Sequence, residues 1–179
     1  IEKACQDLNL VYIPEVEYSK SGAPMVNSAF QLAYKKAKFD ILCWINTDII
    51  LIADLPKVIA SVPFKKFLLV GQRIDYDSEI DINNLDIEKI KLNGKLHPPC
   101  GIDYHIFTRE VYDIVPPFIK GRSRYDNWLI WEALRKKVPV IDCTETIICI
   151  HQNHPSWITR ANNDIAREEV AHNISLCPQ

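Results

Sequence analysis

The stretch KFDILCWINTDIILI, from Lys38 to Ile52, carries the pattern that decides how the fold is interpreted. Two apolar runs, Ile41–Ile45 and Ile49–Ile52, flank the polar triplet Asn46-Thr47-Asp48. Short apolar runs of this length predict buried strands, so the triplet marks the end of a strand. Ligands of α/β sheets collect at the carboxyl ends of strands, which favours a functional role for the triplet. The alternative is a simple turn in which Asp48 caps the next segment.

The composition is that of an ordinary globular protein. The 179 residues are 47% hydrophobic and 25% charged, and they predict a single domain over residues 1–179. No apolar run is long enough to cross a bilayer. The net charge of −2 argues against a nucleic-acid partner. Because the chain begins at Ile1 rather than Met, we expect an N-terminally incomplete domain.

The six cysteines show no CxxC spacing, and three of them lie within apolar, strand-like runs. This pattern favours buried thiols over a disulfide framework. Free thiols are typical of a reducing compartment, so a cytoplasmic location is expected.

Hydrophobic periodicity predicts alternating helices and strands. Helices are expected at Ile1–Leu8, Val26–Lys38, Leu55–Ser61 and Tyr125–Lys137, with a helical turn at Glu110–Ile114 and a helical tail within Ser156–Cys177. Strands are expected at Leu10–Ile13, Ile41–Ile45, Phe67–Val70, Ile102–Phe107, Val138–Asp142 and Thr146–Ile150. The charged stretch Asp75–His97 is interpreted as an insertion or flexible loop, with Asp86–Leu92 as its best helix candidate. Strands that alternate with helices predict an α/β fold with a mainly parallel central sheet covered on both faces.

Two stretches carry candidate metal ligands. Asp48, at the end of a predicted strand, is a hard oxygen ligand suited to Mg²⁺ or Mn²⁺ on a diphosphate, and Asn46 beside it could bind a sugar hydroxyl. In CIHQNH, His151 and His154 directly follow another apolar strand. An imidazole can complete a metal shell that already holds a carboxylate, although a histidine in this position is often structural.

Two further stretches carry candidate binding or catalytic residues. In HPPCGIDYHIF, residues 97–107, Gly101 allows close backbone approach to a ligand and Asp103 lies just beyond it, unless the segment merely shapes a connection. In SRYDNWLIWEA, residues 123–133, Asp126 and Asn127 stand at the start of a predicted helix. They are interpreted either as a helix cap or as a general base and its neighbour at the mouth of a cleft.

The order of these motifs resembles that of the nucleotide-sugar glycosyltransferases of the GT-A fold. The motifs are Asn46-Thr47-Asp48, then Pro99-Cys100-Gly101-Ile102-Asp103, then Tyr125-Asp126-Asn127, then His151, and the resemblance runs from about Leu10 to His154. The family carries an acidic DxD metal motif after a strand, a glycine-containing loop, an acidic pair at a helix start and a late histidine on the metal. Here Asn46 replaces the first acid of DxD, and Asn127 replaces the second acid of the helix-start pair.

The resemblance implies a fold and a set of roles. The fold would be a Rossmann-like three-layer sandwich with a mainly parallel sheet, without its first strand–helix unit. Asp48 with His151 or His154 would hold Mn²⁺ or Mg²⁺, and Asp126 would be the catalytic base. Asn46, Gly101, Asp103 and Asn127 would bind substrate, and Arg73 would pair with phosphate or an acidic sugar unless it is a solvated surface arginine.

The expected activity is metal-assisted transfer of a sugar from a nucleotide-diphosphate donor to an acceptor hydroxyl. The acceptor, whether saccharide, lipid or protein, is not specified by the sequence. Two alternatives stay open. One is a sugar-nucleotide nucleotidyltransferase, which needs a glycine-rich phosphate loop that the sequence does not display. The other is a catalytically silent sugar-binding or interaction domain. Asn46 and Asn127 favour this alternative because each stands where the family has an acidic residue.

Overall fold

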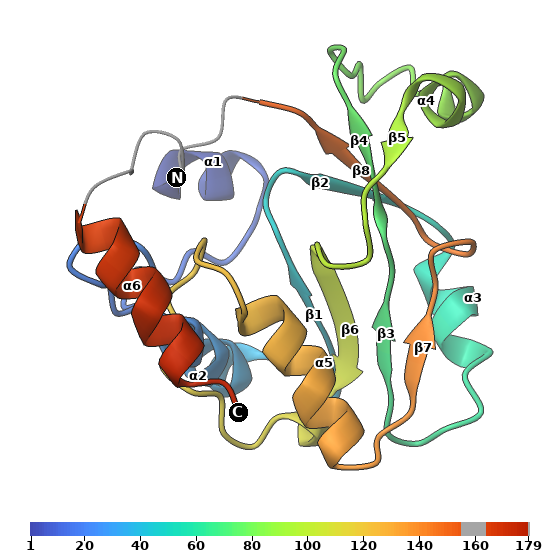
Figure 1. Cartoon of the computed structure of the whole chain (residues 1–179). Coiled ribbons are helices and arrows are strands. Elements are labelled where there is room, and N and C mark those ends of the chain that lie inside the picture. Colours follow the sequence, from blue (N-terminus) through green and yellow to red (C-terminus); the bar gives the residue numbers. More distant parts are fainter. Residues whose placement is uncertain (155–163, 179) are drawn as a thin grey trace. The chain divides into compact units, whose positions relative to one another are not determined.

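The computed structural model describes residues 1–154 and 164–178, and the chain divides into two compact units (Figure 1). The helical unit comprises Ile1–Lys38, Ile114–Ser123 and Asn163–Gln179. The sheet unit comprises Phe39–Asp113 and Arg124–Asn162, and it contains every residue that the sequence predicts for the functional site.

The helical unit is built from α1 (Glu2–Asp7), α2 (Val26–Lys36) and α6 (Asp164–Ser175). In α2 the apolar positions recur every three or four residues, and Val26 and Phe30 are buried. A buried ion pair links Arg122 Nη2 to Glu169 Oε2 of α6 at 2.5 Å. The strand predicted at residues 10–13 is wrong, because this described segment has no regular structure and three of its four side chains are exposed.

Two four-stranded sheets form the sheet unit. The first sheet has the order β1-β6-β3-β7 and the second has the order β2-β8-β4-β5. The strands of the first are β1 (Ile41–Ile45), β6 (Tyr104–Thr108), β3 (Leu68–Val70) and β7 (Val140–Asp142). Those of the second are β2 (Ile49–Ile52), β8 (Ile148–Gln152), β4 (Arg73–Tyr76) and β5 (Lys95–Leu96). Each sheet has two antiparallel pairings and one parallel pairing, so the prediction of a mainly parallel, GT-A-like sandwich is wrong.

The connections between strands explain this difference. A parallel neighbour requires a crossover of about a dozen residues, whereas the described chain links β1 to β2 through residues 46–48 and β3 to β4 through residues 71–72. Such short links carry the chain from the first sheet into the second. The neighbours within each sheet therefore come from distant segments, as when β6 pairs antiparallel with both β1 and β3.

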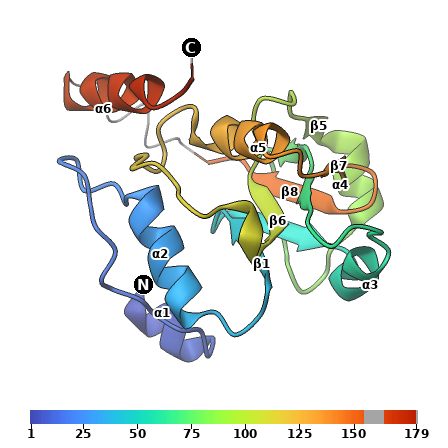
Figure 2. The same cartoon turned by 90° about the horizontal axis from the view of Figure 1, so that it is seen from below.

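The two central strands of the first sheet, β6 and β3, are buried on both faces, whereas edge strand β1 exposes alternate side chains. Side chains alternate along β6, so that His105 lies against α5 (Tyr125–Arg135), where its Nε2 is 3.3 Å from the Asp126 carbonyl oxygen. Ile106 faces the opposite side and belongs to the core cluster against which Val58 and Ile59 of α3 (Leu55–Ala60) pack. The two helices lie on either side of β6 (Figure 2). The predicted helices at residues 55–61 and 125–137 are thereby confirmed.

The charged middle of the chain is folded rather than a flexible loop. Residues 75–97 contain the second half of β4, then α4 (Ile87–Asn93) and β5, so the interpretation as an insertion or loop is wrong. The helix predicted at residues 86–92 is confirmed, and the Asp86 side chain caps it by accepting a hydrogen bond from the Lys89 backbone N–H at 3.0 Å. The predicted turn at residues 110–114 corresponds to the short 3₁₀ helix Arg109–Val111. Residues 156–163 of the predicted helical tail lie outside the described part of the chain.

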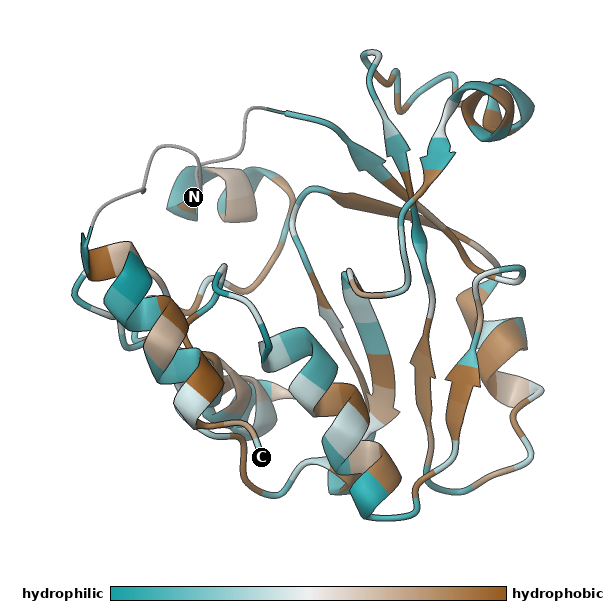
Figure 3. Cartoon of the chain, viewed as in Figure 1, coloured by the Kyte–Doolittle hydropathy of each residue, from teal (hydrophilic) through white to brown (hydrophobic). Residues whose placement is uncertain are grey.

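Apolar residues run along the strands of the first sheet, whereas the end of β8 is hydrophilic (Figure 3). All six cysteines are free thiols, of which Cys143 and Cys149 are buried and Cys43 and Cys100 are exposed. Within the described residues, every helix is too short or too polar to traverse a lipid bilayer.

Candidate metal centre

The polar triplet 46–48 forms the turn between β1 and β2. The Asn46 backbone N–H donates to the Asp103 carbonyl oxygen at 3.0 Å, and the Asn46 carbonyl oxygen accepts from the Ile49 N–H at 3.3 Å. These bonds fix the turn against the start of β6. Asp48 consequently stands at the edge of the second sheet, immediately before β2, and is exposed.

The register of the second sheet places His151 next to this turn. His151 of β8 lies opposite Ile49 of β2 in an antiparallel pair and opposite Asp75 of β4 in a parallel pair. His154 follows β8 by two residues. Two separate segments, about a hundred residues apart in the sequence, therefore meet at one edge of the second sheet.

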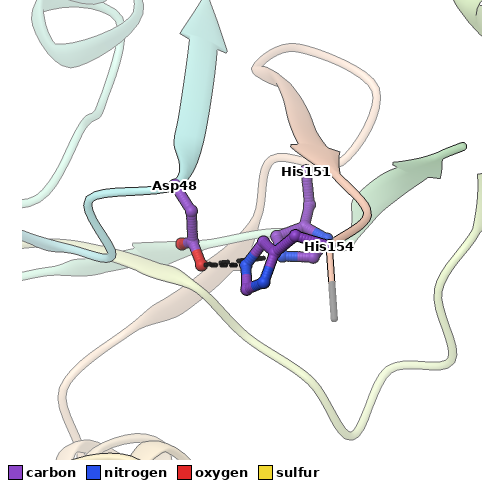
Figure 4. Close-up of side chains that lie close together, drawn as sticks. All are labelled: Asp48, His151 and His154. Carbon is purple, nitrogen blue, oxygen red and sulfur yellow. Dashed lines mark hydrogen bonds and ion pairs between the residues drawn. The ribbon is translucent and has the colours of Figure 1, made fainter. Parts of the chain in front are cut away.

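Asp48, His151 and His154 form a compact cluster in which one ligand atom from each lies within 4.8 Å of the others. The Asp48 Oδ2 atom is 3.2 Å from His154 Nε2 and 3.6 Å from His151 Nε2. The three side chains converge on one point (Figure 4). The structure therefore brings together the three residues that the sequence predicts as metal ligands.

The electrostatics of the cluster favour an ionised carboxylate. Partial burial acts to raise the pKa of Asp48, but the hydrogen bond from His154, a backbone hydrogen bond and the nearby imidazoles of His151 and His154 together outweigh burial and lower it. Asp48 is therefore negatively charged at neutral pH, as a metal ligand must be.

The donor set fits a divalent transition-metal cation. One carboxylate oxygen and two imidazole nitrogens, with separations of 3.2 and 3.6 Å from the oxygen, match the spacing of ligands bound at about 2.1 Å to one ion. Two histidines and one carboxylate on one side of a cation leave its other positions open to a substrate. Imidazole suits Mn²⁺ better than Mg²⁺, which prefers an all-oxygen shell.

A second polar cluster lies next to this centre. It contains four side chains close to the links between the two sheets: Asn46, Arg73, Asp75 and Asp103. Arg73 Nη1 donates to Asp103 Oδ2 at 2.5 Å, and Arg73 Nε donates to Asp75 Oδ1 at 2.7 Å. The Asn46 side-chain nitrogen donates to the other oxygen of Asp103 at 2.5 Å. Arg73 is thus not a solvated surface arginine, because two carboxylates hold it. Its predicted pairing with phosphate or an acidic sugar stays a prediction.

Sequence reasoning missed two members of this cluster, His97 and Asp75. His97 Nδ1 lies 2.6 Å from Asp75 Oδ2, and the Gln72 side-chain nitrogen donates to the His97 carbonyl oxygen at 2.6 Å. Burial acts to raise the pKa of Asp75, but hydrogen bonds from His97 and Arg73 lower it overall. Arg73 and Asp75 are two residues apart, and residues with this spacing on a strand lie on the same face of the sheet. This spacing is visible in the sequence and could have identified the pair.

Gly101 has a different neighbour from the one expected. A Cβ atom added to it would lie 2.6 Å from Cδ2 and 2.7 Å from Nε2 of His97. The missing side chain therefore makes room for the His97 ring within the same loop. The prediction that Gly101 admits a ligand to the backbone remains a prediction.

Asp126 and Asn127 lie in the first turn of α5, where Asp126 is half-buried and Asn127 is exposed. The N-cap residue is Arg124, whose side chain makes no capping hydrogen bond, so Asp126 and Asn127 are not the N-cap residues. Asp126 Oδ1 instead accepts from the Asn127 N–H at 2.9 Å.

The neighbourhood of Asp126 is acidic. Burial is the main cause that raises the pKa of the adjacent Tyr125 hydroxyl, and three carboxylates raise it further: Asp126, Asp103 and Asp48. Asp126 and the three candidate metal ligands all belong to the sheet unit.

Comparison of the chain with family models, with curated proteins and with solved structures found no match.

Proposed function

We propose that this chain is a divalent-metal-dependent glycosyltransferase that uses a nucleotide-diphosphate sugar as donor. The observation that carries the proposal is the convergence of Asp48, His151 and His154 within 4.8 Å. Motif order provides the second support, since the triplet, the 99–103 loop, the 125–127 helix start and His151 resemble those of nucleotide-sugar glycosyltransferases.

The roles follow from the chemistry of each group. Asp48, His151 and His154 would hold the cation, for which we favour Mn²⁺ over Mg²⁺ because two ligands are imidazoles. The cation, when bound, offsets the charge that develops on the leaving diphosphate. Asp126 would accept the proton of the acceptor hydroxyl. Asn46 would orient a sugar hydroxyl, and the buried Asp103, which accepts hydrogen bonds from Asn46 and Arg73, would hold Asn46 in place.

The metal assignment is tested by thermal unfolding with UDP or GDP in the presence and absence of Mn²⁺. We expect the nucleotide with Mn²⁺ to raise the Tm of the wild type and to leave the Tm of Asp48→Ala unchanged, because a ligand stabilises only a state that binds it. The matched control is Asp40→Ala, an exposed aspartate at the opposite end of β1, which should respond as the wild type does. Equal Tm shifts in Asp48→Ala and the wild type would refute the assignment.

The catalytic base is tested by Asp126→Asn, which keeps the shape of the side chain and removes its basicity. We expect loss of sugar transfer with the Mn²⁺-dependent nucleotide shift retained. Nucleotide binding without transfer in the wild type, assayed with a panel of donors, would instead favour a silent sugar-binding domain.

A further inference from the structure

His151 is held more closely than His154. The His151 side chain is 13% exposed and lies between two neighbouring strands, whereas the His154 side chain is 48% exposed and lies beyond the end of β8. The groups around the His151 ring determine which of its two nitrogens carries the proton and which faces Asp48 with a lone pair.

The Nδ1 side of the His151 ring faces two acceptors. Asn153 Oδ1 lies 3.1 Å from Nδ1, and Asp75 Oδ1 lies 3.6 Å from it. The side-chain nitrogen of Asn153 donates to Asp77 Oδ1 at 2.7 Å, which turns the Asn153 oxygen toward the imidazole. On the Nε2 side, the Asp48 oxygen is more distant, at 3.6 Å. A neutral ring in this setting carries its proton on Nδ1 and has its lone pair on Nε2.

Asp75 is itself fixed through both of its oxygens. Oδ2 is 2.6 Å from His97 Nδ1, and Oδ1 accepts from Arg73 Nε at 2.7 Å. Arg73 is in turn held by the 7% exposed Asp103. These contacts keep a negative charge at a constant place beside His151, and they do so without any contact between Asp75 and the point on which the three candidate ligands converge.

We propose that Asp75 is a positioning residue of His151: its negative charge stabilises the same Nδ1–H form of the imidazole that the hydrogen bond to Asn153 selects, so that Nε2 faces the cation. The proposal rests on the metal site of the proposed function. A carboxylate behind a metal-bound histidine orients the ring and makes it a stronger ligand, and loss of such a group costs about 10- to 100-fold in metal affinity. At 3.6 Å, Asp75 acts on the ring mainly through its charge, whereas Asn153 acts through a hydrogen bond.

The first test measures Mn²⁺ binding to the full chain, without nucleotide, by calorimetry. Asp75→Asn preserves the size of the side chain and removes its charge, and we expect the Mn²⁺ Kd to rise about 10- to 100-fold. Asp40→Asn, which neutralises a distant exposed aspartate, should leave the Kd unchanged. Failure of the wild type to bind Mn²⁺ would overturn the proposed metal site. Equal Kd values for the wild type and Asp75→Asn would overturn the role of Asp75 alone.

The second test begins with the wild type alone, so its first result does not depend on whether a variant folds. Nitrogen-15 NMR of the metal-free wild type at about pH 8, where imidazole is neutral, identifies the protonated nitrogen of His151. We expect the proton on Nδ1 in the wild type and a mixture of both forms in Asp75→Asn. A wild-type His151 protonated on Nε2, or an unchanged spectrum in Asp75→Asn, would overturn the positioning role.

Discussion

The two sheets of the sheet unit share one pattern of pairing, and yet their strands carry different residues. In the first sheet, β3 and β6 are buried along their whole length. In the second sheet, β2 is half-buried throughout, and β4 carries Arg73 and Asp75 while β8 carries His151. Both sheets combine two antiparallel pairs with one parallel pair, so pairing alone does not create the candidate site.

The difference shows how the fold combines stability with a polar site. The first sheet places apolar side chains between α3 and α5, where burial provides the main stabilisation. The second sheet also has a buried cluster, formed by Tyr76, Ile90 and Ile150, but the half-buried positions of β4 and the end of β8 leave room for charged side chains. Asn46 and Asp48, then Arg73, and then the 97–103 loop all lie at or beside the links where the chain passes between the sheets.

The largest expected effect comes from deleting core atoms in the first sheet. Ile106 is 2% exposed, and Ile106→Ala should lower the free energy of unfolding by about 2 to 5 kcal/mol, because transfer and cavity costs add. The matched variant is Ile74→Ala on half-buried β4, for which we expect about 1 kcal/mol. Urea denaturation followed by circular dichroism measures both values. Equal losses would mean that the two sheets contribute equally to the core.

An intermediate effect is expected at Gly71, in the link between β3 and β4. A Cβ atom there would lie 2.2 Å from the Tyr104 hydroxyl oxygen, and Tyr104 is fully buried. Gly71→Ala should therefore destabilise the protein by about 1 to 3 kcal/mol through overpacking. The measurement is again the free energy of unfolding in urea.

Tyr104→Phe provides the control for this clash. The Tyr104 hydroxyl has no hydrogen-bond partner among the described residues, so its removal alone should cost little. In the double variant Gly71→Ala/Tyr104→Phe, the nearest remaining atoms are the Thr144 backbone nitrogen at 3.0 Å and the Tyr104 ring carbon Cζ at 3.1 Å from the new Cβ, so part of the lost stability should return. Simple additivity of the two single changes would contradict the clash.

The sequence predicted elements better than their pairing. The periodicity of α2 and α5 and the apolar run of β1 are local properties, and the observed elements match them. Strand partners depend on distant segments such as β6, which no local pattern specifies. The three-residue link at 46–48 was nonetheless an available signal, because it is too short for a parallel crossover.

The residues of the candidate site also fall into two groups: those that local sequence patterns identify and those that depend on strand pairing. Asp48, His151 and His154 follow predicted strand ends, and ligands collect at the carboxyl ends of strands, so the sequence alone groups these three residues. Asp75 and His97 acquire their roles from the register that sets Asp75 opposite His151 and from the loop that brings His97 to Asp75. Strand register is a property of the assembled sheet and cannot be taken from one segment of sequence. Because the observed sheet is mixed and not parallel as expected, the positions of Asp75 and His97 beside the site were not predicted.

The smallest effect concerns the pH dependence of stability, in which the two sheets should differ. The folded pKa of Asp75 lies below its ordinary value, so the carboxylate stabilises the folded state above about pH 4, and this contribution is lost as the pH falls through the folded pKa. In metal-free buffer, the stability difference between the wild type and Asp75→Asn should therefore shrink between about pH 5 and pH 3. The difference between the wild type and Ile106→Ala should stay constant over that range, because no charge is involved. Urea denaturation at several pH values measures both differences, and a constant Asp75 difference would show that its charge does not stabilise the second sheet.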